Sequence, residues 1–125
     1  MTDPTAHTFR ADAFPAIVAH RGASSSRPEN TIPSFEEAVR LGAGIVEFDV
    51  RLSRDGVAMV MHDPTVDRTT DGTGFVHELT ASELSSLNAG TETEPTPVPT
   101  LAEVLAIMSG RAAIAVEIKN IPGEP

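Results

Sequence analysis

The sequence predicts an α/β protein with a mostly parallel sheet, for three reasons. Segments of strand and helix character alternate in the order β-α-β-β-α-α-β rather than in separate groups. Polar side chains recur at the ends of the predicted strands, where ligands bind in parallel α/β sheets and barrels. The composition, 40% hydrophobic and 22% charged residues in 125, is that of one globular domain. We expect this domain to follow a flexible N-terminal arm over residues 1–15.

The first strand and the first helix each have short local signals. Residues 17–19, Ile-Val-Ala, form an apolar run before a His-Arg-Gly turn and predict a buried strand. After a loop rich in Ser and Pro, either Asn30 or Thr31 caps a helix that has Pro33 in its first turn. Gly42 marks the end of this helix.

Two strands follow in quick succession. Residues 45–53 alternate between polar and apolar positions and predict a strand with one polar face. Residues 57–61 predict a further strand that ends at His62. The link between them is too short for a crossover helix, so either a tight hairpin or an extended return outside the sheet joins them. A hairpin sets Glu47 opposite His62, and both alternatives bring these two side chains together.

The second half of the chain begins with a loop over residues 64–76 and ends with a strand. Residues 90–99, with three prolines, predict a linker. Residues 112–120 predict the last strand, with Glu117 and Lys119 facing inward. Two capping boxes between these segments predict the starts of two helices, at Thr80 with Glu83 and at Thr100 with Glu103.

The charge balance and residue types exclude several kinds of site and partner. The chain has 9 Lys and Arg against 18 Asp and Glu, a formal net charge of −9, which argues against nucleic acid or an anionic membrane as partner. Because Cys is absent, no disulfide, thiolate metal site or Cys nucleophile can form. No apolar stretch approaches the roughly 18 residues of a membrane span, and we read no secretory signal. We therefore expect a cytoplasmic protein.

Three carboxylates are candidate ligands of a divalent cation. Glu47 and Asp49 share one face of a strand because side chains alternate with period two, and we expect Glu117 to converge on them from a neighbouring strand. Two like charges about 4 Å apart repel by roughly 4 kcal/mol at an effective dielectric constant near 20. Such a cluster needs a cation or shared protons, and its oxygen ligands suit Mg²⁺ or Ca²⁺. The alternative is a solvated strand face with ordinary salt bridges.

Two histidines and two cations lie near these carboxylates in the predicted fold. His20 and His62 are candidate acid and base, because an imidazole exchanges protons near neutral pH. Either one could instead satisfy a buried carbonyl. Arg21 and Lys119 suit the oxygens of a phosphate, or alternatively only neutralise the carboxylates. The loop over residues 67–74 lacks the spacing of a calcium or phosphate loop, and we interpret it as a set of turns.

A series of short motifs runs in order through nearly the whole chain, from residue 17 to about residue 120. They are HRG at 20–22, PENT at 28–31, ExDV at 47–50, DG at 55–56, HD at 62–63, RTTxGxG at 68–74, PTL at 99–101 and ExK at 117–119. Together these motifs closely resemble the glycerophosphodiester phosphodiesterase family.

The resemblance implies a (β/α)₈ barrel of the TIM type, with its active site at the C-terminal ends of the strands. Residues 16–125 would form the N-terminal half of this barrel, with about its first four strands. The implied reaction is metal-dependent hydrolysis of a small-molecule glycerophosphodiester to sn-glycerol 3-phosphate and an alcohol, through a cyclic phosphate. By position, the resemblance assigns proton transfer to His20 and His62, Mg²⁺ or Ca²⁺ ligation to Glu47, Asp49 and Glu117, phosphate binding to Arg21 and Lys119, and support of the first loop to Glu29 and Asn30.

The length departs from the family pattern, because a (β/α)₈ barrel needs about 250 residues. A half barrel leaves unpaired sheet edges and an uncovered apolar face, which favour association. We therefore expect a portion of a longer barrel, or two copies that close on each other as a homo-oligomer. Two other functions stay open, namely a fragment that binds metal or phosphate without turnover, and a related lyase that stops at the cyclic phosphate.

Overall fold

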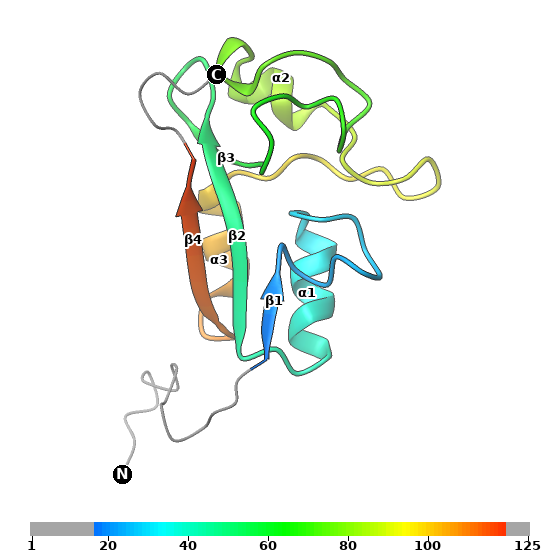
Figure 1. Cartoon of the computed structure of the whole chain (residues 1–125), viewed down its shortest axis with the longest axis vertical. Helices are drawn as coiled ribbons and strands as arrows, with labels where there is room; N and C mark the ends of the chain where they lie inside the picture. Colours follow the sequence, from blue (N-terminus) through cyan, green and yellow to red (C-terminus); the bar gives the residue numbers. More distant parts are fainter. Residues whose placement is uncertain (1–16, 120–125) are drawn as a thin grey trace.

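A four-stranded sheet is the centre of the computed structural model, which describes residues 17–119 (Figure 1). The long strand β2 (Ile45–Leu52) pairs in parallel with β1 (Val18–His20) and with β4 (Ala113–Ile118). The short strand β3 (Ala58–Val60) pairs with β2 in the antiparallel sense. The predicted mostly parallel sheet is therefore confirmed, with one strand reversed.

The backbone hydrogen bonds of β2 show how its neighbours are arranged. The N–H groups of Arg21, just after β1, and of Met61, just after β3, donate to carbonyls of odd-numbered β2 residues, at 2.7 and 3.0 Å. The N–H of Lys119, just after β4, donates to an even-numbered carbonyl at 2.9 Å. Because successive carbonyls of a strand point to opposite edges, β1 and β3 follow one another along one edge, and β4 occupies the other.

The connection between β2 and β3 is a hairpin, which decides between the two alternatives left by the sequence. Val50 pairs with Val60 in its register. The expectation that a hairpin sets Glu47 opposite His62 is wrong, because β3 ends at Val60 and His62 has already left the ladder. The N–H of Met61 still donates to the Asp49 carbonyl at 3.0 Å, so His62 leaves the hairpin beside the acidic face of β2.

Three α-helices and one 3₁₀ turn connect the strands. Thr31, rather than Asn30, caps the first helix, by accepting a hydrogen bond from a backbone N–H in the first turn at 3.3 Å. Both predicted capping boxes are present, in each case with the Thr side chain and the Glu side chain exchanging bonds with the backbone. The elements are α1 (Ile32–Arg40), η3 (Val76–Glu78), α2 (Ala81–Ser85) and α3 (Leu101–Met108).

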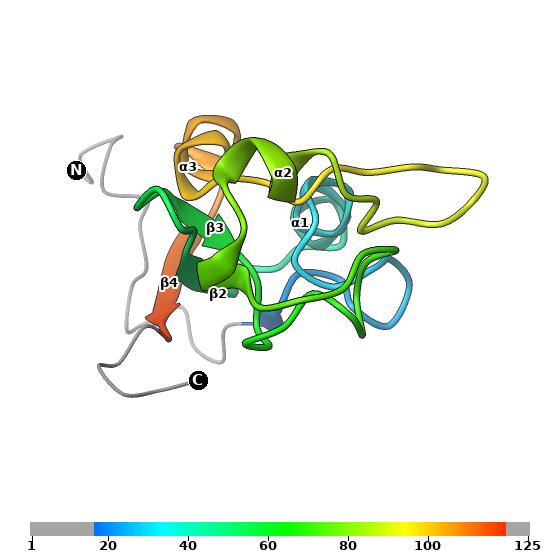
Figure 2. The ribbon, with the colours of Figure 1, turned by 90° about the horizontal axis from the view of Figure 1, so that it is seen from above.

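The main core lies between the sheet and two helices on one of its faces. Figure 2 shows α1 and α3 on the same side of the strands. Phe35 of α1 packs against Phe48 of β2 with ring centroids 5.2 Å apart, and both side chains are fully buried. Val46 and Val50 of β2 join the same cluster together with Met108 of α3. Because the even-numbered side chains of β2 enter this core, its odd-numbered side chains point to the opposite face.

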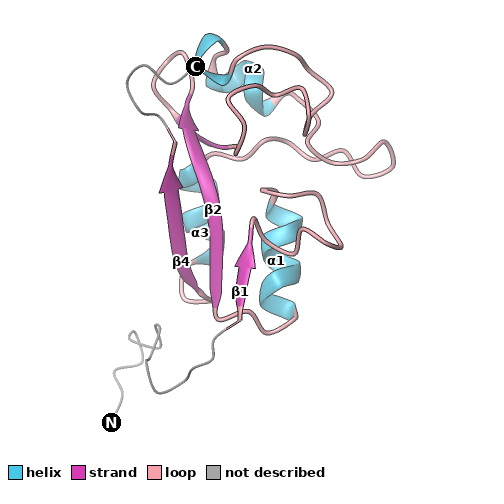
Figure 3. Ribbon diagram, in the orientation of Figure 1, coloured by secondary structure: helices cyan, strands magenta, loops and turns pink. Residues whose placement is uncertain are grey.

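A second, smaller core lies between β3 and the long segment that follows it, which Figure 3 shows as loops around α2. Its buried members are Met59, Met61, Val66, Val76, Leu84, Ala89 and Val98. The segment over 90–99, predicted as a linker, thus contributes Val98 to a core, and the Pro99 carbonyl accepts a hydrogen bond from the N–H of Val60 at 2.9 Å. This packing holds the His62 region against the sheet.

The sheet is open at two edges. Among residues 17–119, no strand covers the outer edge of β1 or of β4, and Ile118 on β4 is 72% exposed. The helices in this part of the chain are all too short or too polar to cross a membrane. The predicted N-terminal arm, residues 1–15, and the end of the predicted last strand at Asn120 lie outside the described residues.

Candidate functional site

The candidate site begins on the face of β2 that points away from the helices. Glu47 and Asp49 share this face, as the alternation predicts. Asp49 is fully buried and the Glu47 side chain is 16% exposed. Burial of Glu47, together with the neighbouring charge of Asp49, raises the pKa of the Glu47 carboxyl. Two acidic groups are thus held in a position where ionising both costs free energy.

The neighbouring strand β4 adds a third carboxylate. Its parallel register places Glu117 directly beside Asp49. Glu47, Asp49 and Glu117 each offer one oxygen, and these oxygens all lie within 4.8 Å of one another. Lys119 donates a hydrogen bond of 3.0 Å to Glu117 and thereby lowers the pKa of the Glu117 carboxyl. The three carboxylates that the sequence placed on two strands are brought together in space.

Four buried polar atoms in this region lack a hydrogen-bond partner, and residues 17–119 contain no other buried side-chain atoms of this kind. They are Arg21 Nε, Asn30 Oδ1, Glu47 Oε1 and Asp49 Oδ1. A buried polar group without a partner costs about 1–3 kcal/mol. Three of the four are oxygens, two in the acidic cluster itself and one on the neighbouring Asn30, and an all-oxygen donor set suits Mg²⁺ or Ca²⁺. The nitrogen belongs to Arg21, whose guanidinium forms an ion pair with Asp49 at 3.5 Å.

The loop after β1 is held close to the cluster by unusual backbone conformations. Arg21 and Asn30 both have positive φ, 60° and 57°, which non-glycine residues rarely adopt. The Asn30 N–H donates to the Arg21 carbonyl at 3.0 Å, so the two ends of the loop meet. The Asn30 side chain then donates to Asp49 Oδ2 at 3.1 Å. Backbone strain of this kind concentrates at functional sites.

Arg21 lies between two acidic groups. Its Nη1 donates to Glu29 at 3.3 Å, and its Nε lies 3.5 Å from Asp49 without hydrogen-bond geometry. Arg21 and Lys119 therefore both contact carboxylates of the site, as the alternative interpretation of these cations expects. The unpaired Nε of Arg21 shows that its donors are not all occupied by them.

The two histidines lie in different settings. His20 ends β1, and its Nε2 lies 3.3 Å from Glu47 Oε1, again without hydrogen-bond geometry. His62 follows β3, and its Nδ1 is 2.8 Å from Asp63 Oδ1. Its backbone carbonyl accepts a hydrogen bond of 2.9 Å from Nε of the buried Arg51. The hairpin thus carries His62 back towards the sheet and fixes both its backbone and its ring.

Two residues of the site were missed by the sequence analysis. Asp63 accepts hydrogen bonds from Arg68 and, more weakly in effect, from His62, and these lower the pKa of its carboxyl far below the usual range. Arg68 also binds Glu29 through two nitrogens, at 2.9 and 3.1 Å. The carboxylate directly after His62 was a usable signal. Arg68 lies in the loop interpreted as turns, where Asp67 does have that role by accepting the Gly74 N–H at 3.0 Å.

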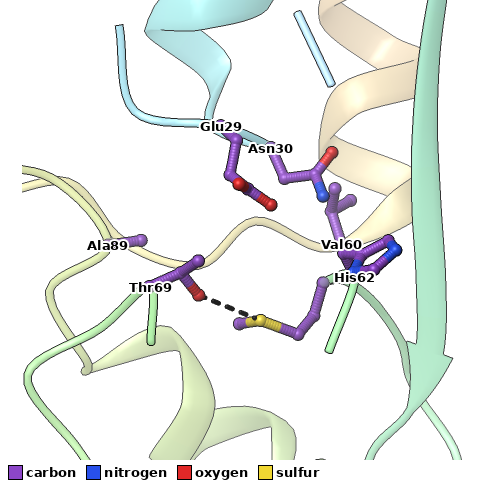
Figure 4. A pocket seen from close by; sticks show the side chains of 7 residues that line it. Glu29, Asn30, Val60, His62, Thr69 and Ala89 are labelled. Carbon is purple, nitrogen blue, oxygen red and sulfur yellow. Dashed lines mark hydrogen bonds between the residues drawn. The ribbon is translucent and has the colours of Figure 1, made fainter. Parts of the chain in front are cut away.

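A small pocket lies between the first loop and the segment after β3. Figure 4 shows Glu29 and Asn30 on one side of it, with His62 and Thr69 reaching it from the other segments. Val60, Met61 and Ala89 complete its lining. Polar groups from segments far apart in the sequence therefore line one hollow next to the acidic cluster.

Comparison with known proteins places this arrangement in a family. The sequence profile of the Glycerophosphoryl diester phosphodiesterase family matches residues 20–124. A glycerophosphodiester phosphodiesterase of Caldanaerobacter subterraneus is 43% identical over 109 residues, which are 83% of this chain and 45% of that protein. The chain spans less than half the length of this relative.

Two solved structures agree with the sequence comparison. A glycerophosphodiester phosphodiesterase from Agrobacterium tumefaciens is 43% identical with a TM-score of 0.81, covering 84% of this chain and 47% of the other. An Oleispira antarctica phosphodiesterase, solved with the product sn-glycerol-3-phosphate, is 38% identical with a TM-score of 0.82, covering 87% and 46%. The expected TIM-barrel type is thereby confirmed, with this chain as part of a barrel. The chain belongs to the glycerophosphoryl diester phosphodiesterase family.

Proposed function

We propose that the barrel of which this chain is part hydrolyses glycerophosphodiesters to sn-glycerol 3-phosphate and an alcohol, with a divalent cation as cofactor. The observation that carries the proposal is the cluster of three carboxylates within 4.8 Å, flanked by Arg21 and Lys119. Family membership supports the reaction class. The product bound to the Oleispira antarctica phosphodiesterase supports a small phosphate ester as ligand.

Glu47, Asp49 and Glu117 would hold the cation, either Mg²⁺ or Ca²⁺. The unpaired buried oxygens of Glu47 and Asp49 support this role, because a cation would satisfy both. A divalent cation bound there would supply positive charge that stabilises the phosphoryl oxygens in the transition state.

Arg21 and Lys119 would bind the phosphate of the substrate. Arg21 keeps one buried donor, Nε, without a hydrogen-bond partner, so it can contact a phosphate oxygen without losing Glu29. Lys119 is held next to the cluster by its bond with Glu117. Asn30 and Glu29 would support this loop, Asn30 through Asp49 and Glu29 through Arg21.

His20 and His62 would transfer protons in the reaction. In the first step, one histidine accepts the proton of the glycerol 2-hydroxyl, and the oxygen of this hydroxyl forms a bond to phosphorus. The bond from phosphorus to the alcohol oxygen breaks, and the alcohol leaves with a proton from the other histidine. Water then adds to the cyclic phosphate and opens it, with the proton transfers reversed. This second step yields sn-glycerol 3-phosphate.

Phosphorus NMR of glycerophosphocholine incubated with the complete barrel tests the proposal. We expect metal-dependent release of sn-glycerol 3-phosphate that EDTA abolishes, and loss of this release in His20→Ala, His62→Ala and Glu47→Ala. Turnover retained in all three variants would refute the assignment. Accumulation of a cyclic phosphate would instead identify a lyase.

A second candidate function is metal or phosphate binding without turnover. The observation that favours it is that the three candidate metal ligands lie on only two strands, β2 and β4, which pair directly with one another. Calorimetric titration with Mg²⁺ or Ca²⁺ separates the two, because binding without any product in the NMR assay supports this candidate over hydrolysis.

A further inference from the structure

Arg68 uses all three of its guanidinium nitrogens to join two carboxylates from distant parts of the chain. Its Nε and Nη2 donate to the two oxygens of Asp63, at 2.8 and 3.0 Å. Its Nη1 and Nη2 donate to the two oxygens of Glu29, at 2.9 and 3.1 Å. Isolated surface ion pairs contribute little to the stability of a protein. A network of bidentate Arg–carboxylate pairs is an exception, because its geometry is fixed. Arg68 therefore determines how the Asp63 carboxylate is oriented.

The Asp63 carboxylate passes this orientation on to His62. Asp63 Oδ1 accepts from Arg68 and lies 2.8 Å from His62 Nδ1. An ionised carboxylate is only an acceptor, so Nδ1 must carry the proton in this contact. The neutral ring then has its unprotonated nitrogen at Nε2, to which no group within residues 17–119 hydrogen bonds. The partner of one ring nitrogen thus decides the protonation of the other.

The other end of the arginine is anchored in the loop that reaches the acidic cluster. Glu29 accepts from Arg21 as well as from Arg68, and these positive charges outweigh its burial and lower the pKa of its carboxyl. The adjacent Asn30 donates to Asp49. Through Glu29, the position of Arg68 is therefore tied to the same loop that contacts β2.

We propose that Arg68 is a positioning residue for His62: anchored on Glu29, it orients Asp63, which keeps the His62 proton on Nδ1 and leaves Nε2 as the nitrogen that exchanges protons. This role rests on proton transfer by His62 in the proposed function. Arg68 does not touch the reacting atoms in this scheme. It acts through Asp63, so its removal changes the state of the ring rather than the set of reacting groups.

Nitrogen-15 NMR of the histidine rings measures this state directly. Long-range proton–nitrogen correlations distinguish the Nδ1–H from the Nε2–H tautomer in the neutral ring. The chain has four His, and His62→Gln identifies the signals of this one. In EDTA, at a pH where the rings are neutral, we expect wild-type His62 to be almost wholly Nδ1–H. Asp63→Ala should shift the tautomer ratio towards Nε2–H by about tenfold, because a hydrogen bond to a charged group is lost.

Arg68→Gln should shift the ratio in the same direction by several-fold, although it leaves Asp63 in place. Arg68→Lys keeps the charge but not the two-pronged geometry, so it should also shift the ratio, and it serves as the second variant if Arg68→Gln does not fold. Arg27→Gln, which removes a surface arginine 3.6 Å from Glu94, is the matched control and should leave His62 unchanged. Amide spectra of each variant report its folding.

An unchanged ratio in folded Arg68 variants would overturn the positioning role, and an unchanged ratio in Asp63→Ala would overturn the whole chain of contacts. The measurement uses neither metal nor substrate. Failure of the proposed hydrolysis would therefore appear in the product assay alone, and failure of the positioning role in the tautomer ratio alone.

Discussion

Replacing Glu47 by Gln should stabilise the metal-free protein and remove most of its stabilisation by a cation. The raised pKa of the Glu47 carboxyl means that the folded state binds this proton more tightly than the unfolded state does. The free energy of unfolding therefore falls as the pH rises from the ordinary value of 4.5 through the folded pKa. At neutral pH the neutral Gln side chain resembles the protonated form, so the variant avoids this loss.

The magnitude follows from the geometry of the two buried carboxylates. Charges 4.8 Å apart, the upper limit for this cluster, repel by about 3.5 kcal/mol at an effective dielectric constant near 20. The Glu47 side chain is 16% exposed and lies 3.3 Å from His20, so solvent and the neighbouring imidazole reduce this figure. We expect a gain of about 1 kcal/mol in EDTA, or an increase in Tm of about 4 °C for a domain of this size.

Thermal and urea unfolding in EDTA and in excess Mg²⁺ or Ca²⁺ measure both effects. A ligand at 100 times its Kd stabilises the folded wild type by about 2.7 kcal/mol, and the variant should show only a small part of this because one of three carboxylates is gone. Glu92→Gln, in an exposed loop position, is the matched control and should behave as the wild type. A Glu47→Gln protein that is less stable in EDTA and responds to the cation as fully as the wild type would refute the reasoning.

Three further changes test the loops around the site by urea or thermal unfolding. Asn30→Ala should cost about 1–3 kcal/mol, because it removes the donor to buried Asp49 and puts Ala at a φ of 57°. Asp63→Asn should weaken the loss of stability at acidic pH. The lowered pKa of the Asp63 carboxyl adds stability above its ordinary value of 3.8, and this stability is lost as the pH falls below that value. An unchanged pH dependence in the variant would contradict this prediction. Gly22→Ala should lower the free energy of unfolding more than Gly56→Ala does. Both glycines have a φ of 82°, but only at Gly22 would a Cβ lie 2.9 Å from the backbone of α1. Equal losses in the two variants would show that this crowding is unimportant.

Local chemistry made part of the fold predictable from sequence. The capping boxes of α2 and α3 each depend on residues three apart, so they appear wherever the chain carries them. The alternation of β2 likewise identified the acidic face, because the period of a strand is a property of the backbone. The convergence of Glu117 with Asp49 also follows from parallel pairing, once both segments are strands of one sheet.

Contacts that depend on loop paths could not be predicted in this way. Arg68 and Glu29 are 39 residues apart and meet only because the second core holds the segment after β3 against the first loop. The register of the β2–β3 hairpin depends on its turn, and this placed His62 outside the ladder. Thr31 is the N-cap of α1 because Asn30 has a left-handed backbone conformation and its side chain donates a hydrogen bond to Asp49 instead.

The distribution of the site over the chain separates cation binding from turnover. The three carboxylates lie on β2 and β4, two strands paired along six residues and backed by the buried core under β2. The strand pairing and the core that hold the cluster are therefore found within residues 17–119. The relatives have more than twice the matched length, and the outer edges of β1 and β4 are uncovered within residues 17–119. We therefore expect this chain to bind Mg²⁺ or Ca²⁺ with the affinity of a complete barrel within about tenfold, even where its turnover is far lower. Titration calorimetry of this chain and of the Agrobacterium tumefaciens enzyme makes the comparison, and a loss of cation affinity as large as the loss of turnover would show that the cluster is not a self-contained site.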